Sequence, residues 1–514
     1  MRRLCVKIFA GWLLCVGTVS IAVAEVKLPS VFSSHAVLQR EMPVPVWGWA
    51  AKGEKVTVTL GSQSATATAD DSGKWSVRLD ALEAGGPLSL VVKGTNTIKV
   101  DDILVGEVWL CSGQSNMGMT VGGVLNAKEE IAGANYPKIR QFHVANKTAE
   151  TPQSECQGTW SVCSPETVGG YSATAYFFGW QLHKDLSIPI GLINSSWGGT
   201  PIEAWTCEQL QIKTPELKPG VDGWNQKIAD WNKEKAEEKY AKDLTNWKKH
   251  EAKAKAEHKP APRRPNAPAD PRFAPHRPGS LYNGMIVPLV PYALRGAIWY
   301  QGESNAGRGE LYGLQLQTMI GNWRELWNQG DFPVLFVQLP NFQKPQTEPV
   351  ENSGWALVRE GMFKTLQKTP KTGMAITIDV GEDANIHPKN KQEVGRRLGL
   401  FALRDVYSKK IVGCGPLYKS MTRDGDKIVV TFECQDSGLV AKGEKVEGFA
   451  IAGADKKFVW ADAKIDGDRV VVSSPTVKNP VAVRYAWATN PKCNVYNQAG
   501  IPASPFRTDD GPTK

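Results

Sequence analysis

Short apolar runs alternate with helix-compatible stretches through the middle of the chain, from residue 106 to about residue 408. Each run has the length and composition of a buried strand. Strands that alternate with helices are typical of an α/β domain with a mainly parallel sheet. In such sheets, ligands bind at the loops that follow the carboxyl ends of the strands. The predicted strands are 108–110, 188–193, 296–300, 334–338 and 374–378, and the predicted helices are 173–186, 310–327 and 390–405.

Strand composition flanks this α/β region on both sides. Before it, runs such as 44–49 and 55–60 alternate in polarity and are separated by Gly, Asp and Ser turns, which predicts a small β-sandwich. After it, strand composition returns at 427–432, 469–473 and 480–487. The predicted units are an N-terminal β-sandwich module (25–105), an α/β domain (106–408) and a C-terminal β module (409–514).

An insertion at 208–280 interrupts the α/β pattern. Trp224, Ile228 and Trp231 recur at helical spacing among Lys, Glu and Ala residues, and 259–278 is rich in proline. We predict a helical excursion packed by tryptophans, followed by an extended linker. A helix lying on a membrane surface is the alternative, but a packing face explains the tryptophans more simply.

The first 24 residues have the pattern of a secretory signal peptide. Arg2, Arg3 and Lys7 precede a mostly apolar stretch, 8–23, and a small-x-small cleavage pattern ends at Ala24. The apolar stretch is short for a membrane span and charged residues follow at once. We therefore expect cleavage near Ala24 and an exported protein, periplasmic or extracellular, with no membrane span in the mature chain.

The charge distribution argues against nucleic acid as a partner. The formal net charge is +9, three of these charges lie in the signal peptide, and residues 224–278 hold fourteen Lys or Arg against eight Asp or Glu. The rest of the chain is therefore close to neutral, whereas a nucleic-acid-binding domain concentrates basic residues on its functional surface.

Two of the nine cysteines lie in the signal peptide, which leaves seven. None forms a CxxC pair, so zinc ribbons and thiol redox chemistry have no support. In an exported chain some cysteines are expected to form disulfides. Cys414 and Cys434 flank a hairpin-like stretch and are a candidate pair, while an odd total leaves at least one cysteine free.

The strongest local motif is a buried strand that runs directly into Gly113-Gln114-Ser115. A serine at that point presents its hydroxyl at the sheet edge, near backbone N–H groups, as an acyl-transfer nucleophile requires. The sequence that follows lacks the second glycine of a Gly-x-Ser-x-Gly elbow, which disfavours the ordinary α/β-hydrolase.

His387 is the candidate general base. It follows an apolar run and a polar loop and precedes a predicted helix, where a layered α/β enzyme places such a residue. A structural or surface role is the default for the other six histidines: His35, His143, His183, His250, His258 and His276.

Two further loops follow predicted strands. In one, Gln301 or Asn305 is placed to donate an amide N–H to a developing oxyanion. In the other, Gly198 and Gly199 permit close backbone approach to a ligand. Each of these two loops alone could be an ordinary hydrogen-bonded turn. Together with the loops of Ser115 and His387, however, they make four polar loops after predicted strands in one domain, which favours an active site.

These loops resemble, in order, the characteristic blocks of the sialate O-acetylesterase family, which belongs to the SGNH hydrolases. The resemblance runs from about residue 26 to residue 507, apart from the insertion. The matching segments are GQSNM (113–117), WGGTP (197–201), WYQGESN (299–305) and IHP (386–388).

The resemblance implies an SGNH-type three-layer α/β/α domain and a serine esterase mechanism. Ser115 attacks an acetyl carbonyl and His387 takes its proton. The oxyanion is held by the backbone N–H of Ser115, a glycine of the 198–199 pair, with Gly199 as first choice, and the amide of Gln301. Glu303 and Asn305 belong to the same block and are predicted to line the substrate site. No metal or cofactor is implied.

The carboxylate that orients His387 is left open. Relatives carry Asp two or three residues before this histidine, where this chain has Asn385 and Ala384. Asp383 is the first choice for the third catalytic residue. The other candidates are Glu382, Asp379 and Glu303, and a backbone carbonyl is a further alternative.

The resemblance thus implies an exported carbohydrate O-acetylesterase acting on O-acetyl sialic acid. Acetyl-xylan or another acetylated polysaccharide is an alternative substrate. A non-catalytic glycan-binding protein on an esterase fold is an alternative of another class, and retention of both Ser115 and His387 argues against it. Oligomeric state has no sequence signal.

Overall fold

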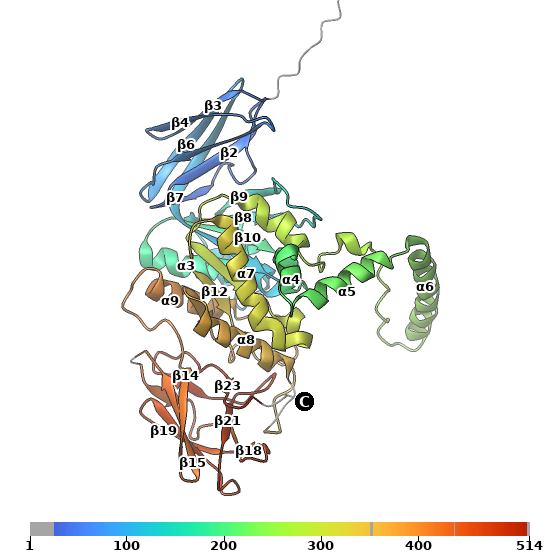
Figure 1. Cartoon of the computed structure of the whole chain (residues 1–514), viewed down its shortest axis with the longest axis vertical. Coiled ribbons are helices and arrows are strands. Elements are labelled where there is room, and N and C mark those ends of the chain that lie inside the picture. The colour runs from blue at the N-terminus through green and yellow to red at the C-terminus, as the bar shows by residue number, and fades with distance from the viewer. Residues whose placement is uncertain (1–24, 350–352, 436, 511–514) are drawn as a thin grey trace, which may run out of the picture.

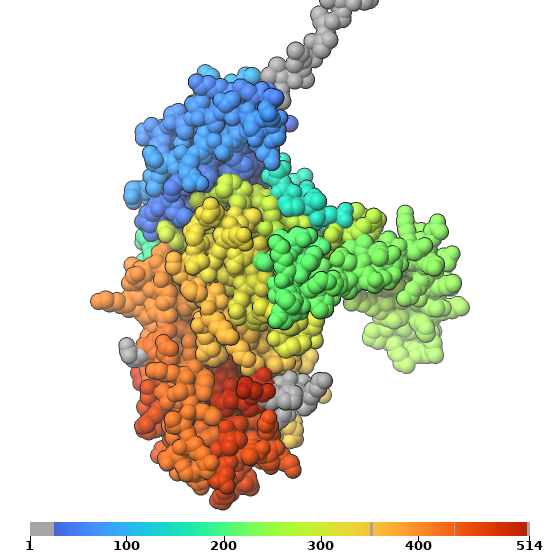
Figure 2. Space-filling view, in the orientation of Figure 1, coloured from blue at the N-terminus to red at the C-terminus, as the bar shows by residue number. Residues whose placement is uncertain are grey.

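The computed structural model describes residues 25–349, 353–435 and 437–510. The predicted signal peptide, 1–24, lies outside the described residues. Three parts follow one another along the long axis of the molecule: N-terminal strands, a central α/β part and C-terminal strands (Figure 1). Helices of the insertion project sideways from the central part (Figures 1 and 2).

The N-terminal part is built mostly from antiparallel strand pairs. Its strands are β1 (Val37–Gln39), β2 (Val44–Trp49), β3 (Lys55–Leu60), β4 (Gln63–Thr68), β5 (Lys74–Leu79), β6 (Gly85–Lys93) and β7 (Thr97–Gly113). β2 pairs with β5, while β3 pairs with β4 and β6. Burial alternates along β5, where Trp75, Val77 and Leu79 face the core. Alternating polarity in the sequence therefore selects one buried face.

The central sheet shares β7 with the N-terminal part. Its other strands are β8 (Tyr136–Val144), β9 (Gly158–Cys163), β10 (Ile190–Ser196), β11 (Gly296–Tyr300), β12 (Val334–Val337) and β13 (Thr372–Ala375). The order is β13-β12-β11-β7-β10-β8-β9, and only β9 on this path is antiparallel to its neighbour. The predicted boundary at 105/106 falls inside β7, which runs continuously through both parts.

Helices pack against both faces of this sheet, which confirms the predicted α/β class. The long helices are α3 (Ala173–Leu186), α7 (Tyr312–Trp327), α8 (Gly354–Lys368) and α9 (Lys391–Asp405), and the short ones are α1 (Ser115–Gly118) and α2 (Ala127–Gly133). Trp109 on β7 contacts Phe178 on α3, with ring centroids 5.0 Å apart. On the opposite face Trp299 on β11 contacts Trp323 on α7 at 5.7 Å. β11 and β12, which are covered on both faces, consist of apolar residues, as the runs predicted.

The insertion forms helices α4 (Glu208–Lys213), α5 (Lys218–Ala229) and α6 (Lys233–Ala256), as predicted, and then an extended return segment. α6 has no buried residue. The indole N–H of Trp247 donates to the carbonyl of Pro262 (2.7 Å), and Arg264 lies over the same ring. The tryptophan face thus packs the proline-rich segment against the helix. Nowhere in 25–349, 353–435 or 437–510 is a helix both long and apolar enough to span a membrane.

The C-terminal part is antiparallel and has its own apolar core around Ile428, Phe449 and Val470. One sheet has the order β14-β15-β20-β19 and another β18-β17-β21-β23. The strands are β14 (Leu417–Asp424), β15 (Lys427–Glu433), β16 (Leu439–Ala441), β17 (Phe449–Ala452), β18 (Val459–Trp460), β19 (Asp462–Asp466), β20 (Arg469–Ser473), β21 (Ala482–Tyr485), β22 (Val495–Asn497) and β23 (Phe506–Arg507).

The cysteine expectation is wrong for the described residues, because all seven cysteines outside 1–24 are free thiols. The thiol of Cys414 points to the carbonyl of Met374 on β13, in the central sheet. Burial raises the pKa of Cys434 to about 11 and that of Cys163 likewise to about 11. These side chains therefore act as small apolar core residues.

Arg359 on α8 joins the central part to the C-terminal part. Its guanidinium is fully buried and donates to the carbonyls of Leu339 (2.7 Å) and Pro340 (2.7 Å). It also donates to the backbone carbonyls of Ala488 (2.6 Å) and Thr489 (3.0 Å) in the C-terminal part. One side chain thus satisfies buried carbonyls from two separate segments.

Arg359→Met is expected to destabilise the protein, because these buried carbonyls lose their donor at a cost of about 3 kcal/mol or more. The melting temperature measured by differential scanning fluorimetry is expected to fall by roughly 5 °C or more. Lys368→Met, at an exposed position of the same helix, is the control and leaves the melting temperature unchanged. Equal melting temperatures for the two variants contradict the prediction.

Candidate active site

Ser115 lies where the central strand β7 ends. β7 ends at Gly113, and α1 begins at Ser115 itself. Gly113 has φ +142°, and a Cβ at this position would stand 2.1 Å from the carbonyl oxygen of Tyr300 on β11. Only glycine allows this approach. The chain therefore turns out of the sheet at once and leaves the side chain of Ser115 half-buried at its edge.

His387 comes to Ser115 from the loop between β13 and α9. Its Nε2 lies 2.8 Å from Ser115 Oγ, across 272 residues of sequence. Asn385 fixes the loop, since its Oδ1 accepts from the backbone N–H of His387 (3.0 Å) and its Nδ2 donates to the His387 carbonyl (2.8 Å). The structure thus brings together the two residues that the sequence singled out, at hydrogen-bonding distance.

The environment favours the neutral form of the His387 imidazole. Burial lowers its pKa below the ordinary value of 6.5, and the positive charge of Lys391 lowers this pKa further. A histidine that accepts a proton from a serine hydroxyl has to start in the neutral form. The surroundings therefore extend the pH range in which His387 is able to act as a base.

The carboxylates near His387 bind other partners. Asp383 accepts a hydrogen bond from Nδ2 of Asn490 (2.7 Å). Glu382 accepts hydrogen bonds within its own loop, and Asp379 forms a salt bridge with an arginine of α9. In the described part of the chain no hydrogen bond joins the His387 ring to a carboxylate. The assignment of Asp383 as third catalytic residue stays a prediction.

The glycine pair after β10 lies against the serine. A Cβ on Gly198 would stand 3.3 Å from Ser115 Cβ. Gly199 has φ +76°, and a Cβ there would meet nothing within 4 Å. The backbone of this turn therefore approaches Ser115 on one side and borders open space on the other.

Gln301 and Asn305 form a buried network beneath that turn. Nε2 of Gln301 donates to the carbonyl of Thr200 (3.2 Å) and to Oδ1 of Asn305 (2.7 Å). Nδ2 of Asn305 donates to Glu203 Oε2 (2.9 Å), and Oε1 of Gln301 accepts from Tyr312 (2.8 Å). For Gln301 to donate to an oxyanion, one of its two bonds has to open. Its role in the oxyanion site stays a prediction.

A second buried network was missed by the sequence analysis. Nζ of Lys391, the first residue of α9, donates to Oδ1 of Asn116 (2.7 Å) and to the carbonyl of Pro388 (2.7 Å). Asn116 in turn donates to Oε1 of Glu303 (2.5 Å), whose pKa is raised by burial. Burial lowers the pKa of Lys391 to about 7. The one sequence signal for this lysine is its place four residues after His387.

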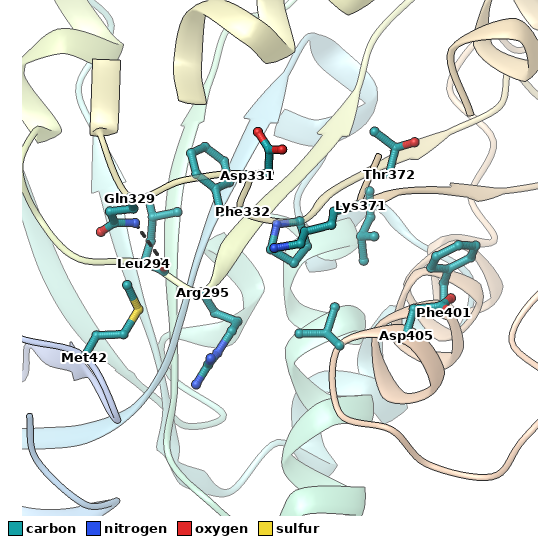
Figure 3. Close-up of a pocket in the computed structure, with 13 residues that line it drawn as sticks. Met42, Leu294, Arg295, Gln329, Asp331, Phe332, Lys371, Thr372, Phe401 and Asp405 are labelled. Carbon is teal, nitrogen blue, oxygen red and sulfur yellow. Dashed lines mark hydrogen bonds between the residues drawn. The ribbon is translucent and has the colours of Figure 1, made fainter. Parts of the chain in front are cut away.

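A cavity of about 360 Å³ is lined by residues such as Met42, Phe332 and Phe401 (Figure 3). Arg295 and Lys371, which line it, directly precede β11 and β13. It therefore opens at the amino ends of the strands, whereas Ser115 follows a carboxyl end. None of the predicted site residues lines this cavity.

Comparisons with known proteins identify relatives of this chain. Residues 272–400 match the family model described as "Carbohydrate esterase, sialic acid-specific acetylesterase". The sialate O-acetylesterase of Rattus norvegicus is 30% identical over 93% of this chain and 94% of its own, and that of Homo sapiens is 30% identical over 95% and 94%. The crystal structure of a carbohydrate acetylesterase from Xanthomonas citri superposes with a TM-score of 0.80 at 37% identity, covering 95% of this chain and 100% of that one.

The fold and these relatives define a carboxylic ester hydrolase built on a large mixed sheet with helices on both faces. The chain belongs to the sialate O-acetylesterase family, as the four sequence blocks predicted. The relatives are matched over nearly their whole length, so the N-terminal and C-terminal β parts belong to the resemblance as well.

The pKa of His387, measured by NMR titration of the imidazole, is expected to lie below 6.5. In Lys391→Met this pKa is expected to rise, because the neutral side chain removes the nearby positive charge, and any loss of His387 burial as the loop loosens acts in the same direction. Lys389→Met removes an exposed lysine only two residues from His387 and serves as the control. A His387 pKa that is unchanged in Lys391→Met contradicts the coupling.

Proposed function

We propose that this chain hydrolyses O-acetyl esters of sialic acid and that Ser115 and His387 carry out the chemistry. The observation that carries the proposal is the 2.8 Å contact between Ser115 Oγ and His387 Nε2 at the carboxyl ends of the parallel strands. The mammalian relatives are sialate O-acetylesterases, which supports the choice of sialic acid. The partner is thus an O-acetylated carbohydrate.

In the first half-reaction Ser115 Oγ attacks the acetyl carbonyl carbon while His387 Nε2 takes the hydroxyl proton. The carbonyl oxygen becomes an oxyanion beside the backbone N–H of Ser115, which is the first residue of α1 and has no acceptor within the helix. The turn of Gly198 and Gly199 borders the same space. When the intermediate collapses, the C–O bond to the sugar breaks and His387 gives its proton to the departing sugar oxygen.

In the second half-reaction water attacks the acetyl group now bonded to Ser115. His387 takes a proton from this water, and the tetrahedral intermediate expels Ser115 Oγ, which recovers the proton from His387. Acetate leaves, and the enzyme returns to its starting state. No step of this cycle requires a metal or a cofactor.

The proposal extends to the fold of the α/β domain. The α/β domain is an SGNH-type three-layer α/β/α domain at 106–408, with the insertion at 208–280. Support comes from α3 and α7 on opposite faces of the sheet and from a nucleophile directly after a strand. The flanking β modules are 25–105 and 409–514. Export after cleavage near Ala24 completes the proposal and rests on the sequence pattern.

The proposal is tested by acetate release from O-acetylated sialic acid and from acetylated xylan, side by side. The wild-type chain is expected to release acetate from sialic acid, and Ser115→Ala is expected to lose about a thousandfold or more of kcat because the nucleophile is gone. Serine-dependent release from xylan alone would keep the mechanism and replace the substrate.

If acetate is released from neither substrate, both O-acetylated sialic acid and acetylated xylan are excluded as substrates. Labelling by a fluorophosphonate probe, absent in Ser115→Ala, then separates an esterase of other specificity from a glycan-binding protein that has lost its chemistry. The probe reports on the activated serine without any assumption about the sugar.

The role of Asp383 is tested by Asp383→Ala. If its carboxylate orients His387 during turnover, kcat is expected to fall by about a hundredfold or more at unchanged melting temperature. Because Asp383 contacts Asn490 in this structure, Asn490→Ala is the control for loss of that contact, and it also removes the side-chain hydrogen bonds of Asn490 to Asn341 and Gln343. Full activity of Asp383→Ala would show that another group, such as a backbone carbonyl, orients the ring.

A further inference from the structure

We infer that the insertion supplies one wall of the sugar-binding site and that this wall binds a carboxylate of the substrate sugar. This inference rests on the proposed function, because it concerns the same site. The observation behind it is a cavity of about 440 Å³ between the insertion and the loops around Ser115. Trp224 and Lys227 of α5 and His276 of the return segment line one side. Gly199 and Ser304 line the other.

The cavity adjoins the reacting serine. Gly199 follows Gly198, whose backbone lies against Ser115, and it leaves open space where a side chain would stand. The backbone N–H of Ser304 donates to Oε1 of Gln114, the residue before Ser115 (3.3 Å). A sugar that occupies the cavity therefore places an acetyl ester near Ser115 Oγ.

The wall formed by the insertion is held in place by specific contacts. The indole N–H of Trp224 donates to the carbonyl of Pro271 (3.3 Å), which ties α5 to the return segment. Arg277 of that segment forms salt bridges with Glu208 of α4 (3.3 Å) and with Glu150 (3.1 Å). The helices project from the domain (Figures 1 and 2), but the part that lines the cavity is anchored.

The Lys, Arg and Glu side chains that line the cavity carry a net positive charge. Glu203 is the acidic residue of the lining, and it is paired with Arg308 (2.8 Å) and with the amide of Asn305. Lys227 lies over the ring of Trp224 at 4.5 Å, and no acidic partner of Lys227 occurs among the described residues.

This combination fits an acidic sugar better than a neutral one. An indole ring offers a flat apolar surface to the C–H groups of a sugar ring. A lysine without an acidic partner offers a charge-assisted hydrogen bond to a carboxylate. A neutral polysaccharide such as xylan would use the indole ring and leave the lysine without a partner.

The test compares O-acetylated sialic acid with its methyl ester, which has the same sugar without the negative charge, and with p-nitrophenyl acetate, which has no sugar. For the wild-type chain kcat/KM is expected to be about tenfold higher for the acid than for the methyl ester. In Lys227→Met this preference is expected to disappear through a rise in KM for the acid alone. Lys239→Met, an exposed lysine of α6, is the matched control.

Trp224→Ala is expected to lower kcat/KM for both sugar esters and to leave p-nitrophenyl acetate unchanged. Equal kcat/KM for acid and methyl ester in the wild-type chain, or an equal loss on both in Lys227→Met, would overturn the inference. Serine-dependent hydrolysis of p-nitrophenyl acetate in the same samples would show that the esterase proposal survives such a failure.

Binding supplies a readout that is independent of catalysis. Ser115→Ala protein is titrated with free sialic acid by calorimetry, and Lys227→Met in that background is expected to weaken binding about tenfold. Unchanged affinity in the double variant overturns the inference even if the enzyme proves to act on another ester.

Discussion

The backbone of Gly113 is the point at which three strands of the central sheet are held together around the serine. The N–H of Gln114 donates to the carbonyl of Tyr300 at the end of β11, and the N–H of Trp197 after β10 donates to the carbonyl of Gly113. A side chain at Gly113 would collide with Tyr300. Any residue other than glycine would therefore push β11 away from β7 and separate the loops that carry Ser115, the glycine pair and Gln301.

The position of the loop that carries His387 depends on a buried lysine, Lys391. Burying an ammonium group costs several kcal/mol unless hydrogen bonds and opposite charge compensate. Lys391 is compensated by Asn116 and Pro388, with Glu303 as the nearby acid. Asn116 follows Ser115 and Pro388 follows His387, so a single ammonium group fixes the spacing of the two reacting residues. The cost of burial is offset only when both loops are in place.

Sequence patterns predicted what depends on periodicity and on strand ends. The runs at 296–300 and 173–186 became β11 and α3 with the same bounds, and the position after a strand identified Ser115. These patterns do not predict which side chains from distant parts of the sequence contact each other. A lysine at the start of a helix looks solvated in sequence, and nothing local shows that Lys391 meets Asn116, 275 residues away. The same holds for the free thiol of Cys414, which faces the central sheet rather than a second cysteine.

The place of the insertion in the chain explains its place in the site. It lies between β10 and β11, and β10 ends at Ser196, one residue before the turn that approaches Ser115. A segment inserted after the carboxyl end of a parallel strand emerges on the edge of the sheet where ligands bind. Lacking an apolar core of its own, as the exposure of α6 shows, it has to anchor on neighbouring loops. One such anchor is Glu150, and the insertion also borders Gly199 and Ser304 of the catalytic loops across one cavity. An insertion here therefore changes the substrate wall while the strands that hold the serine stay as they are.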